Sequence, residues 1–266
     1  MGVVNLTPDS FSHTELLDNP EKVLAKTKQL VQEGARLIDF GAESTAPINN
    51  SISANEEWER FDQLLLPVLA EILDLDIQVS FDTYKITTMR KICDLTPRAI
   101  WWNDISGDYK TALKLIQKYP QLNYIYCHNM APQREQAASH MDFVDLSDGL
   151  VQRVMKSFDE CIAVFSSQGL LSRLALDPCF GFSKSYQQNW ELMEKVPELL
   201  SYYQGLPFLI GISRKSFLKQ YLEKRSIEPT LEKRDQLQLE LIRKIKKKMS
   251  SPREFWVRTH QIFNSP

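Results

Sequence analysis

The sequence predicts an α/β fold of the (β/α)8 barrel class, and three observations support it. Eight short apolar runs alternate with segments of helical periodicity over the 266 residues. The runs are nearly continuous in apolar residues, as expected for parallel strands that are covered on both faces. Polar side chains follow each run. A doubly wound open sheet would share the first two features, and periodicity alone does not exclude it.

The strands and helices can be assigned in order along a single domain, residues 1–266. In the helix expected at 20–34, Pro20 suits the first turn and Gly34 suits a C-cap. Similar amphipathic patterns occupy 55–73 and 143–169. The segment 222–251 is unusually charged for a barrel helix, and only "QIFNSP" follows the last strand, so we expect an atypical or missing last helix. The predicted strands are 2–6, 36–40, 77–81, 98–102, 122–127, 172–176, 206–210 and 255–258.

The composition excludes several classes of protein. A formal charge of −2 does not provide the excess of positive charge that is typical of proteins that bind nucleic acid or an anionic membrane surface. No stretch approaches the ~20 apolar residues of a membrane-spanning helix, and the N-terminus lacks the pattern of a signal peptide. We therefore expect a cytoplasmic protein without nucleic-acid or membrane partners. The four cysteines form no C-x-x-C pair, and we expect them to be reduced thiols: Cys93, Cys127, Cys161 and Cys179.

The polar residues after the strands all fall on one side of the predicted sheet, which in a barrel is the face that carries the active site. Polar loops are common after any strand, but single carboxylates directly after apolar runs are harder to explain in that way. Asp82 ends "VSFD" and Asp177 ends "LALD". Either these carboxylates pair with a nearby Lys or Arg, or they bind a ligand edge rich in N–H donors, with Asn103 beside them.

Two further groups of residues point to an anionic ligand. In "GISRKSF", Ser213 could cap the following helix, with Ser216 and the first-turn N–H groups facing the barrel mouth and Lys215 adding a charge. A well-capped helix and nothing more is the simpler interpretation. Arg258 and His260 alternate after the last strand, next to Asn5 of the first strand if the barrel closes. Together they could bind a dianionic group, with a Mg²⁺ held by the Asn5 amide oxygen and by ligand phosphates.

Several motifs, in order, resemble those of the dihydropteroate synthase family. "NLTPDSFS" at 5–12 is similar to N-V-T-P-D-S-F-S, and "IDFGAESTAP" at 38–47 is similar to I-D-I-G-G-E-S-T-R-P. "VSFDTYK", "NDIS", "LALDPCFGFSK", "LIGISRKSF" and "VRTH" resemble the remaining motifs at about the family's spacing. The resemblance covers residues 2 to about 218 and resumes near 255.

The resemblance implies a TIM barrel that condenses 7,8-dihydropterin-6-ylmethyl diphosphate with 4-aminobenzoate and releases pyrophosphate, in folate biosynthesis, with Mg²⁺ and as a sulfonamide target. The implied diphosphate and metal site is Asn5, Arg258 and His260. The implied 4-aminobenzoate and loop positions are Phe11, Thr45, Pro47, Phe182 and Ser216. The implied pterin pocket is Asp82, Asn103, Ile105, Asp177, Phe182, Gly211 and Lys215, and the implied catalytic residues are Asn5, Asp82, Lys215, Arg258 and His260.

Four differences from the family pattern keep other functions open. Ala46 replaces a loop arginine, His13 replaces a loop acid, and Cys179 stands at the glycine of D-P-G. The family's last helices help to form its homodimer, and those are altered here. A pterin-binding paralogue without catalytic activity is one alternative. A methyltransferase that moves a methyl group from a reduced folate to a corrinoid is another, but it would not need the diphosphate residues.

Overall fold

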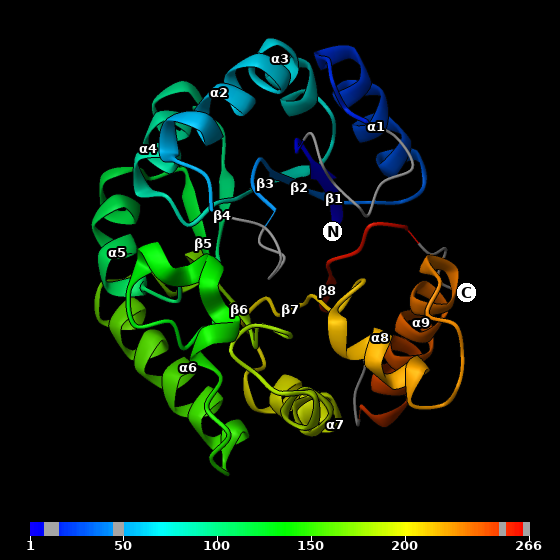
Figure 1. Ribbon diagram of the computed structural model, residues 1–266. Helices are drawn as coiled ribbons and strands as arrows, with labels where there is room; N and C mark the ends of the chain where they lie inside the picture. The colour runs from blue at the N-terminus through cyan, green and yellow to red at the C-terminus, as the bar shows by residue number, and fades with distance from the viewer. Residues whose placement is uncertain (8–15, 45–50, 250–253, 263–266) are drawn as a thin grey trace.

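The computed structural model describes residues 1–7, 16–44, 51–249 and 254–262, and it shows a central ring of strands surrounded by helices (Figure 1). The strands are β1 (Gly2–Asn5), β2 (Leu37–Gly41), β3 (Gln78–Asp82), β4 (Ile100–Asp104), β5 (Leu122–Cys127), β6 (Leu174–Asp177), β7 (Leu209–Ile210) and β8 (Trp256–Val257). Each strand ends within two residues of its predicted carboxyl end. The ring that the strands form confirms the predicted barrel class (Figure 1).

The helices fill the intervals between the strands and form the outer layer (Figure 1). The α-helices are α1 (Pro20–Gln32), α2 (Ala54–Leu64), α3 (Leu66–Leu73), α4 (Ile86–Leu95), α5 (Tyr109–Lys118), α6 (Leu150–Ser167), α7 (Tyr186–Tyr202), α8 (Ser216–Glu223) and α9 (Leu231–Lys248). Two 3₁₀ segments, η1 (Arg134–Phe143) and η2 (Leu171–Arg173), lie on either side of α6 in the chain. The described residues after β8, 258–262, contain no helix.

The strands pair in parallel and in sequence order. β1 to β6 form one six-stranded sheet, and β7 pairs with β8 in a second sheet. Bridges between Leu176 and Phe208 and between Gly2 and Thr259 join the two sheets at both sides. The backbone N–H of Val3 donates to the Thr259 carbonyl at 3.1 Å, so the first strand lies beside the last, as the sequence predicted.

The period-two alternation of the strands decides which side chains face the barrel interior. Trp102, Tyr124 and Phe40 pack outward against the helices in the main core. Their neighbours face inward, where Leu37, Trp101, Ile125, Ala175 and Leu209 form a separate apolar cluster that contacts Trp256. Residues two positions further along these strands face inward at the carboxyl end of the barrel, which places Asp39, Asn103, Cys127, Asp177 and Gly211 there.

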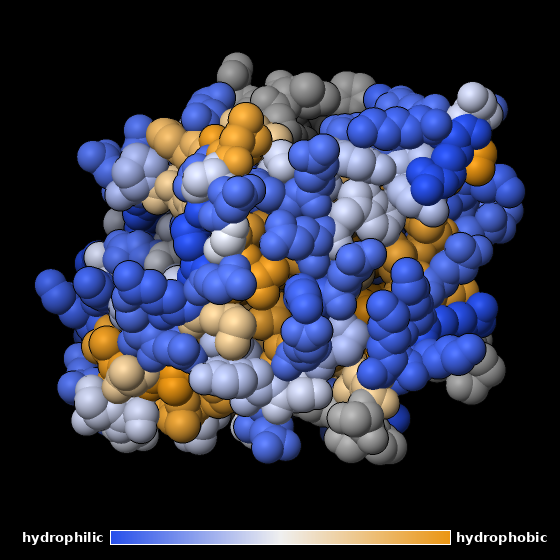
Figure 2. Space-filling view, turned by 90° about the horizontal axis from the view of Figure 1, so that it is seen from below, coloured by the Kyte–Doolittle hydropathy of each residue, from blue (hydrophilic) through white to orange (hydrophobic). Residues whose placement is uncertain are grey.

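Local sequence signals explain how several helices begin and pack. The Asn19 side chain accepts a hydrogen bond from the Lys22 N–H at 2.9 Å, with Pro20 in the first turn of α1 as predicted. The charged helix α9 packs on α7 and α8 through a stripe that includes Leu237, Leu241 and Ile245. Hydrophilic residues cover most of the face seen in Figure 2. None of the helices in the described part of the chain is long and apolar enough to cross a membrane.

Candidate active site

A pocket with an empty volume of about 380 Å³ opens at the carboxyl end of the strands. The inward-facing ends of β3, β4, β5 and β6 form its wall, and the chain after β6, β7 and β8 completes it. Its lining residues are Asp82, Asn103, Ile105, Cys127, Asp177, Cys179, Phe180, Phe182, Gly211, Lys215 and Arg258. All seven residues predicted for the pterin pocket are among them.

Arg258 bridges two carboxylates at one side of this pocket. Its Nε donates to Asp39 Oδ2 at 2.7 Å, and one terminal nitrogen donates to Asp82 Oδ2 at 2.6 Å. Asn103 Nδ2 donates to the same Asp39 oxygen at 2.9 Å. Burial raises the pKa of Asp82 to about 7, against the pull of the guanidinium. The sequence left open whether Asp82 pairs with a Lys or an Arg. It pairs with Arg258, and the pair fixes the guanidinium at the pocket wall.

Asp177 and Lys215 form a second charged group in the pocket lining. Asp177 Oδ1 accepts a hydrogen bond from the Cys179 N–H at 2.7 Å, which fixes the carboxylate at the end of β6. The Lys215 ammonium lies 4.0 Å from the centre of the Phe182 ring. Burial raises the pKa of Asp177 to about 6, and it lowers the pKa of Lys215 to about 8 with help from Arg258. The pocket therefore holds an acceptor and a donor whose charges depend on pH near neutrality.

Gly211 lies between the two charged groups of the pocket lining. A Cβ placed on it would lie 3.8 Å from Arg258 Cβ and 3.9 Å from Asp177 Oδ2. A side chain at this position would therefore point between the arginine and the carboxylate. At these distances a Cβ would make ordinary van der Waals contacts, so only a larger side chain would reduce the space in the pocket.

The prediction that Ser213 caps the next helix was wrong. α8 begins at Ser216, its N-cap residue is Lys215, and no side chain caps it. Ser213 Oγ lies 2.9 Å from His260 Nδ1, because the chain after β7 runs beside the chain after β8. Arg214 lies within 3.4 Å of Asp235, and Ser216 is exposed at the start of α8. The serine and histidine thus form a polar pair near Arg258.

Asn5 ends β1, and Gly41 of β2 lies between it and Asp82 in the register of the sheet. A Cβ placed on Gly41 would lie 3.7 Å from both Asn5 Oδ1 and Asp82 Oδ2. In the described part of the chain, three or more His, Cys, Asp or Glu side chains nowhere gather in a metal-binding group. The donors at this position are one amide oxygen and a carboxylate that Arg258 already binds. Such a set suits Mg²⁺ held mainly by ligand phosphates and water.

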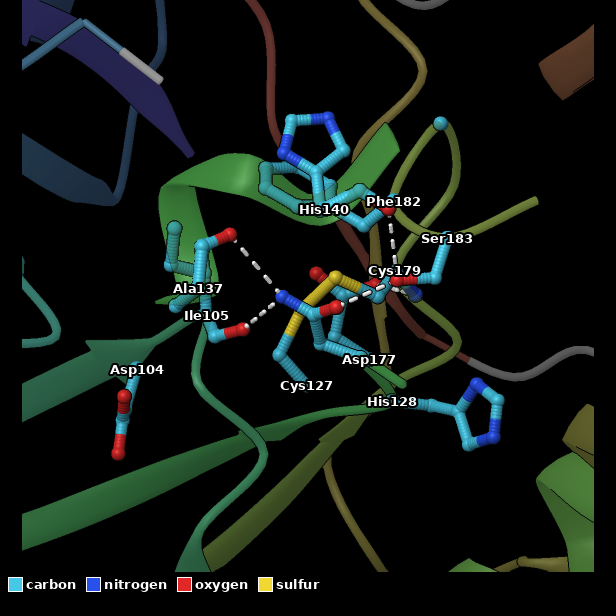
Figure 3. The surroundings of a disulfide bond; sticks show 12 residues. Asp104, Ile105, Cys127, His128, Ala137, His140, Asp177, Cys179, Phe182 and Ser183 are labelled. Carbon is cyan, nitrogen blue, oxygen red and sulfur yellow. Dashed lines mark hydrogen bonds between the residues drawn. A yellow bond between two sulfur atoms is a disulfide. The ribbon is translucent and has the colours of Figure 1, made fainter. Parts of the chain in front are cut away.

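The expectation of four reduced thiols was wrong for two of the cysteines. Cys127 and Cys179 form a disulfide at the edge of the pocket, whereas Cys93 and Cys161 are free and buried (Figure 3). Cys127 and Cys179 are 52 residues apart in the chain, so the sequence alone did not indicate that they pair. The barrel brings the ends of neighbouring strands together, and Cys127 pairs in register with Asp177, two residues before Cys179.

Sequence reasoning gave no role to Asp39, although it anchors the charge network. The alternation of the strand could have indicated this role. Asp39 is two residues after Leu37, which faces the barrel interior, so Asp39 faces the interior as well. Three predicted site residues, Phe11, Thr45 and Pro47, lie outside the described residues, as do Ala46 and His13.

Comparisons with known proteins identify the family of this chain. The sequence profile of the family described as "Pterin binding enzyme" matches residues 1–244. The dihydropteroate synthase of Neisseria meningitidis serogroup C is 36% identical over 223 residues, which are 82% of this chain and 74% of that protein. The Synechocystis dihydropteroate synthase is 32% identical over 227 residues, which are 84% and 74% of the two chains.

Solved structures show the same fold. Yersinia pestis dihydropteroate synthase with a sulfonamide drug superposes with a TM-score of 0.77 at 28% identity, covering 98% of this chain and 87% of that one. The Thermus thermophilus enzyme in complex with 4-aminobenzoate gives a TM-score of 0.71 at 26% identity, covering 98% and 88%. The chain therefore belongs to the pterin-binding enzyme family and, within it, to the dihydropteroate synthases, which are transferases.

Proposed function

We propose that this protein condenses 7,8-dihydropterin-6-ylmethyl diphosphate with 4-aminobenzoate to give 7,8-dihydropteroate and pyrophosphate. One observation carries the proposal: a carboxylate, an amide, a lysine and an arginine converge on a single pocket in a chain whose relatives are dihydropteroate synthases. Among the described residues that line the pocket there is no serine, and both cysteines are joined in the disulfide, so none of these residues offers a hydroxyl or thiol nucleophile. That suits a reaction in which the substrate supplies its own leaving group.

The pterin ring is held between the two charged groups of the pocket lining. Asp177 accepts hydrogen bonds from the N–H donors of the pyrimidine edge, and Asn103 adds a donor and an acceptor. Lys215 donates to a ring acceptor. Ile105 and Phe182 cover the ring with apolar surface, and both are buried. The guanidinium of Arg258, held by Asp39 and Asp82, lies against the ring and faces the diphosphate.

The leaving group is stabilised by cations and polar groups at the ends of the first and last strands. The C–O bond to diphosphate breaks, and the electron-rich pterin stabilises the cation that results. Arg258, His260 and Asn5 bind the diphosphate, and the Ser213 contact orients the His260 ring. A Mg²⁺ bound to the Asn5 amide oxygen and the phosphates would supply further charge neutralisation.

The amine then attacks from the side of α8. The nitrogen of 4-aminobenzoate forms the new C–N bond and loses a proton, and the electron pair of the broken bond leaves with pyrophosphate. Ser216, in the first turn of α8, can donate to the carboxylate of 4-aminobenzoate, and the N-terminus of the helix favours that negative charge. Phe182 lies between the two substrate positions. Phe11, Thr45 and Pro47 complete this subsite in the proposal. The pocket positions the amine for attack and excludes water.

We expect the affinity for the pterin to fall on both sides of neutrality. Below about pH 6 Asp177 becomes protonated and loses an acceptor, and above about pH 8 Lys215 loses its proton and its charge. Calorimetric titrations with the pterin diphosphate between pH 5 and 9 would test this. In Lys215→Arg, the alkaline limb should move beyond pH 9 because arginine stays charged. A profile that is flat over this range would contradict the assignment of both groups.

Binding of dihydropterin diphosphate in the absence of 4-aminobenzoate tests the proposed pocket. We expect one site per chain, with tighter binding when Mg²⁺ is present. Competition by an unreactive pterin should be complete, since both ligands occupy the same ring site. Binding of 4-aminobenzoate alone with no pterin site would contradict the proposal.

A further inference from the structure

The proposed mechanism leaves the Cys127–Cys179 disulfide without a role, although both cysteines line the pocket (Figure 3). Cys127 is the last residue of β5, and Cys179 lies two residues after the end of β6. The bond thus ties the end of one strand to the loop that begins at Asp177. Neither cysteine is more than 3% exposed at the molecular surface.

The disulfide holds the backbone of Cys179 in an unusual conformation. The φ of Cys179 is 60°, in the left-handed region where a non-glycine residue is disfavoured. In this same conformation the Cys179 N–H donates to Asp177 Oδ1 at 2.7 Å. The orientation of the Asp177 carboxylate therefore depends on a backbone conformation that cysteine disfavours, and the covalent link to β5 holds it.

Apolar and polar contacts enclose the disulfide on the side of η1 (Figure 3). Cys127 and Cys179 pack in one cluster with Ile105, Ala137 and Phe182. The His140 ring packs against the Phe182 ring at a tilt of 35°, with 4.0 Å between the ring centres. A shift of the Cys179 backbone would therefore move Phe182, which covers the pocket, as well as Asp177.

Other contacts keep the loop after β6 folded when the disulfide is open. The Lys184 ammonium donates to the carbonyls of His128, Cys179 and Phe182, at 2.9, 3.0 and 2.9 Å. Asn189 Oδ1 accepts from the Gly181 N–H at 2.7 Å. Loss of the tether should therefore produce a local shift at Cys179 and leave the barrel folded.

We propose that the Cys127–Cys179 disulfide is a positioning element of the pterin site and that its reduction by a dithiol weakens pterin binding. This inference rests on the proposed function. In the step itself, a dithiol reductant transfers two electrons and two protons. The S–S bond of the protein breaks, two cysteine thiols form, and the reductant becomes a disulfide. Both cysteines line the pocket, so a reductant must approach the sulfur atoms through it.

Reduction must change the shape of the pocket edge. A disulfide bond is roughly 2 Å long, whereas non-bonded heavy atoms stay about 3.5 Å apart or more. The two thiols must separate, and the disulfide then no longer holds Cys179 in the left-handed region, although Lys184 still binds its carbonyl. That region costs a non-glycine residue about a tenfold factor in an equilibrium constant. We therefore expect about tenfold weaker pterin binding in the reduced protein.

The test uses the full chain, with 6-hydroxymethylpterin monophosphate as the calorimetric probe. We expect two free thiols in the denatured, unreduced protein, four after treatment with dithiothreitol, and a Kd about tenfold higher in the reduced form. Four free thiols before reduction, or equal Kd values for the two forms, would overturn the inference. Failure of the probe to bind either form would instead contradict the proposed function, and the inference with it.

Two matched variants separate positioning from any other effect of the cysteines. Cys127→Ala/Cys179→Ala keeps a side chain at the left-handed residue without a tether, and it should bind the probe like the reduced protein. Cys127→Ala/Cys179→Gly differs by one methyl group, and it should bind like the oxidised protein with no response to dithiothreitol. Equal affinities of these two variants would overturn the role assigned to the Cys179 backbone.

A control and a reciprocal measurement complete the test. Cys93→Ala/Cys161→Ala removes the free thiols and should leave the redox response unchanged. Because coupling between two equilibria is reciprocal, saturating probe should favour the disulfide over the dithiol by the same factor of about ten in a glutathione buffer. A thiol–disulfide equilibrium that the probe does not shift would contradict the inference, since a purely structural disulfide would behave in that way.

Discussion

Replacing Asp177 by asparagine should lower the affinity for dihydropterin diphosphate about 100-fold. The amide would present an N–H to a ligand edge that already carries N–H donors, and a hydrogen bond between a charged group and its partner is worth roughly 1.5–3 kcal/mol. The fold should remain intact, because the asparagine oxygen can still accept from the Cys179 N–H. Calorimetry with the purified variant measures the change.

The stability of the same variant provides a second readout. Burial raises the pKa of Asp177 to about 6, so the folded protein disfavours the ionised form relative to the unfolded chain. This penalty is absent below about pH 4 and complete above about pH 6. Asp177→Asn should therefore unfold at a higher temperature than the wild type at pH 8, with no gain at pH 4. Asp148→Asn, an exposed acid outside the pocket, is the control. Unchanged pterin affinity in a folded Asp177→Asn protein would refute the pocket assignment.

Replacing Arg258 by methionine should lower the free energy of unfolding by about 3 kcal/mol, the lower end of the cost of removing one partner from a buried ion pair, because Arg258 and Asp82 keep 20% and 16% of their side chains exposed. The change leaves Asp39 and Asp82 next to each other without their shared cation. The loss should be smaller at pH 5 than at pH 8, because protonation removes the repulsion between the carboxylates. Chemical denaturation at both pH values measures it, and turnover should also be lost with the diphosphate contact.

Two companion variants show whether the charge network is the cause. Arg258→Lys keeps the charge but cannot bridge both carboxylates through two nitrogens, so its stability should be intermediate. Asp39→Asn/Arg258→Met removes one carboxylate together with the cation and should recover part of the lost stability. If Arg258→Met alone were as stable as the wild type, the network would not support the pocket.

The sequence predicted most of the architecture because its signals are local. Apolar runs and helix-starting residues such as Asn19 and Pro20 depend on few distant contacts. The polar ends of the strands also converge as predicted, since parallel strands of a barrel end on one face. All seven residues that the motif resemblance implied for the pterin pocket line the cavity, whereas Cys127 and Phe180 line it without having been predicted.

The failures concern contacts between segments far apart in the chain. The disulfide joins residues 52 positions apart, and Asp39 reaches Arg258 only because the first and last strands lie side by side. The Ser213 prediction failed for the same reason: the serine contacts His260, from the last strand, instead of its own helix. Local capping rules could not anticipate a partner 47 residues away.

The most direct test of the account is product formation from dihydropterin diphosphate, Mg²⁺ and 4-aminobenzoate, with each omitted in turn. We expect dihydropteroate and pyrophosphate in equal amounts from the complete mixture. We expect no dihydropteroate when dihydropterin diphosphate is omitted and none when 4-aminobenzoate is omitted. Pterin binding without dihydropteroate would contradict the proposed reaction and leave a pterin-binding protein with no synthase activity.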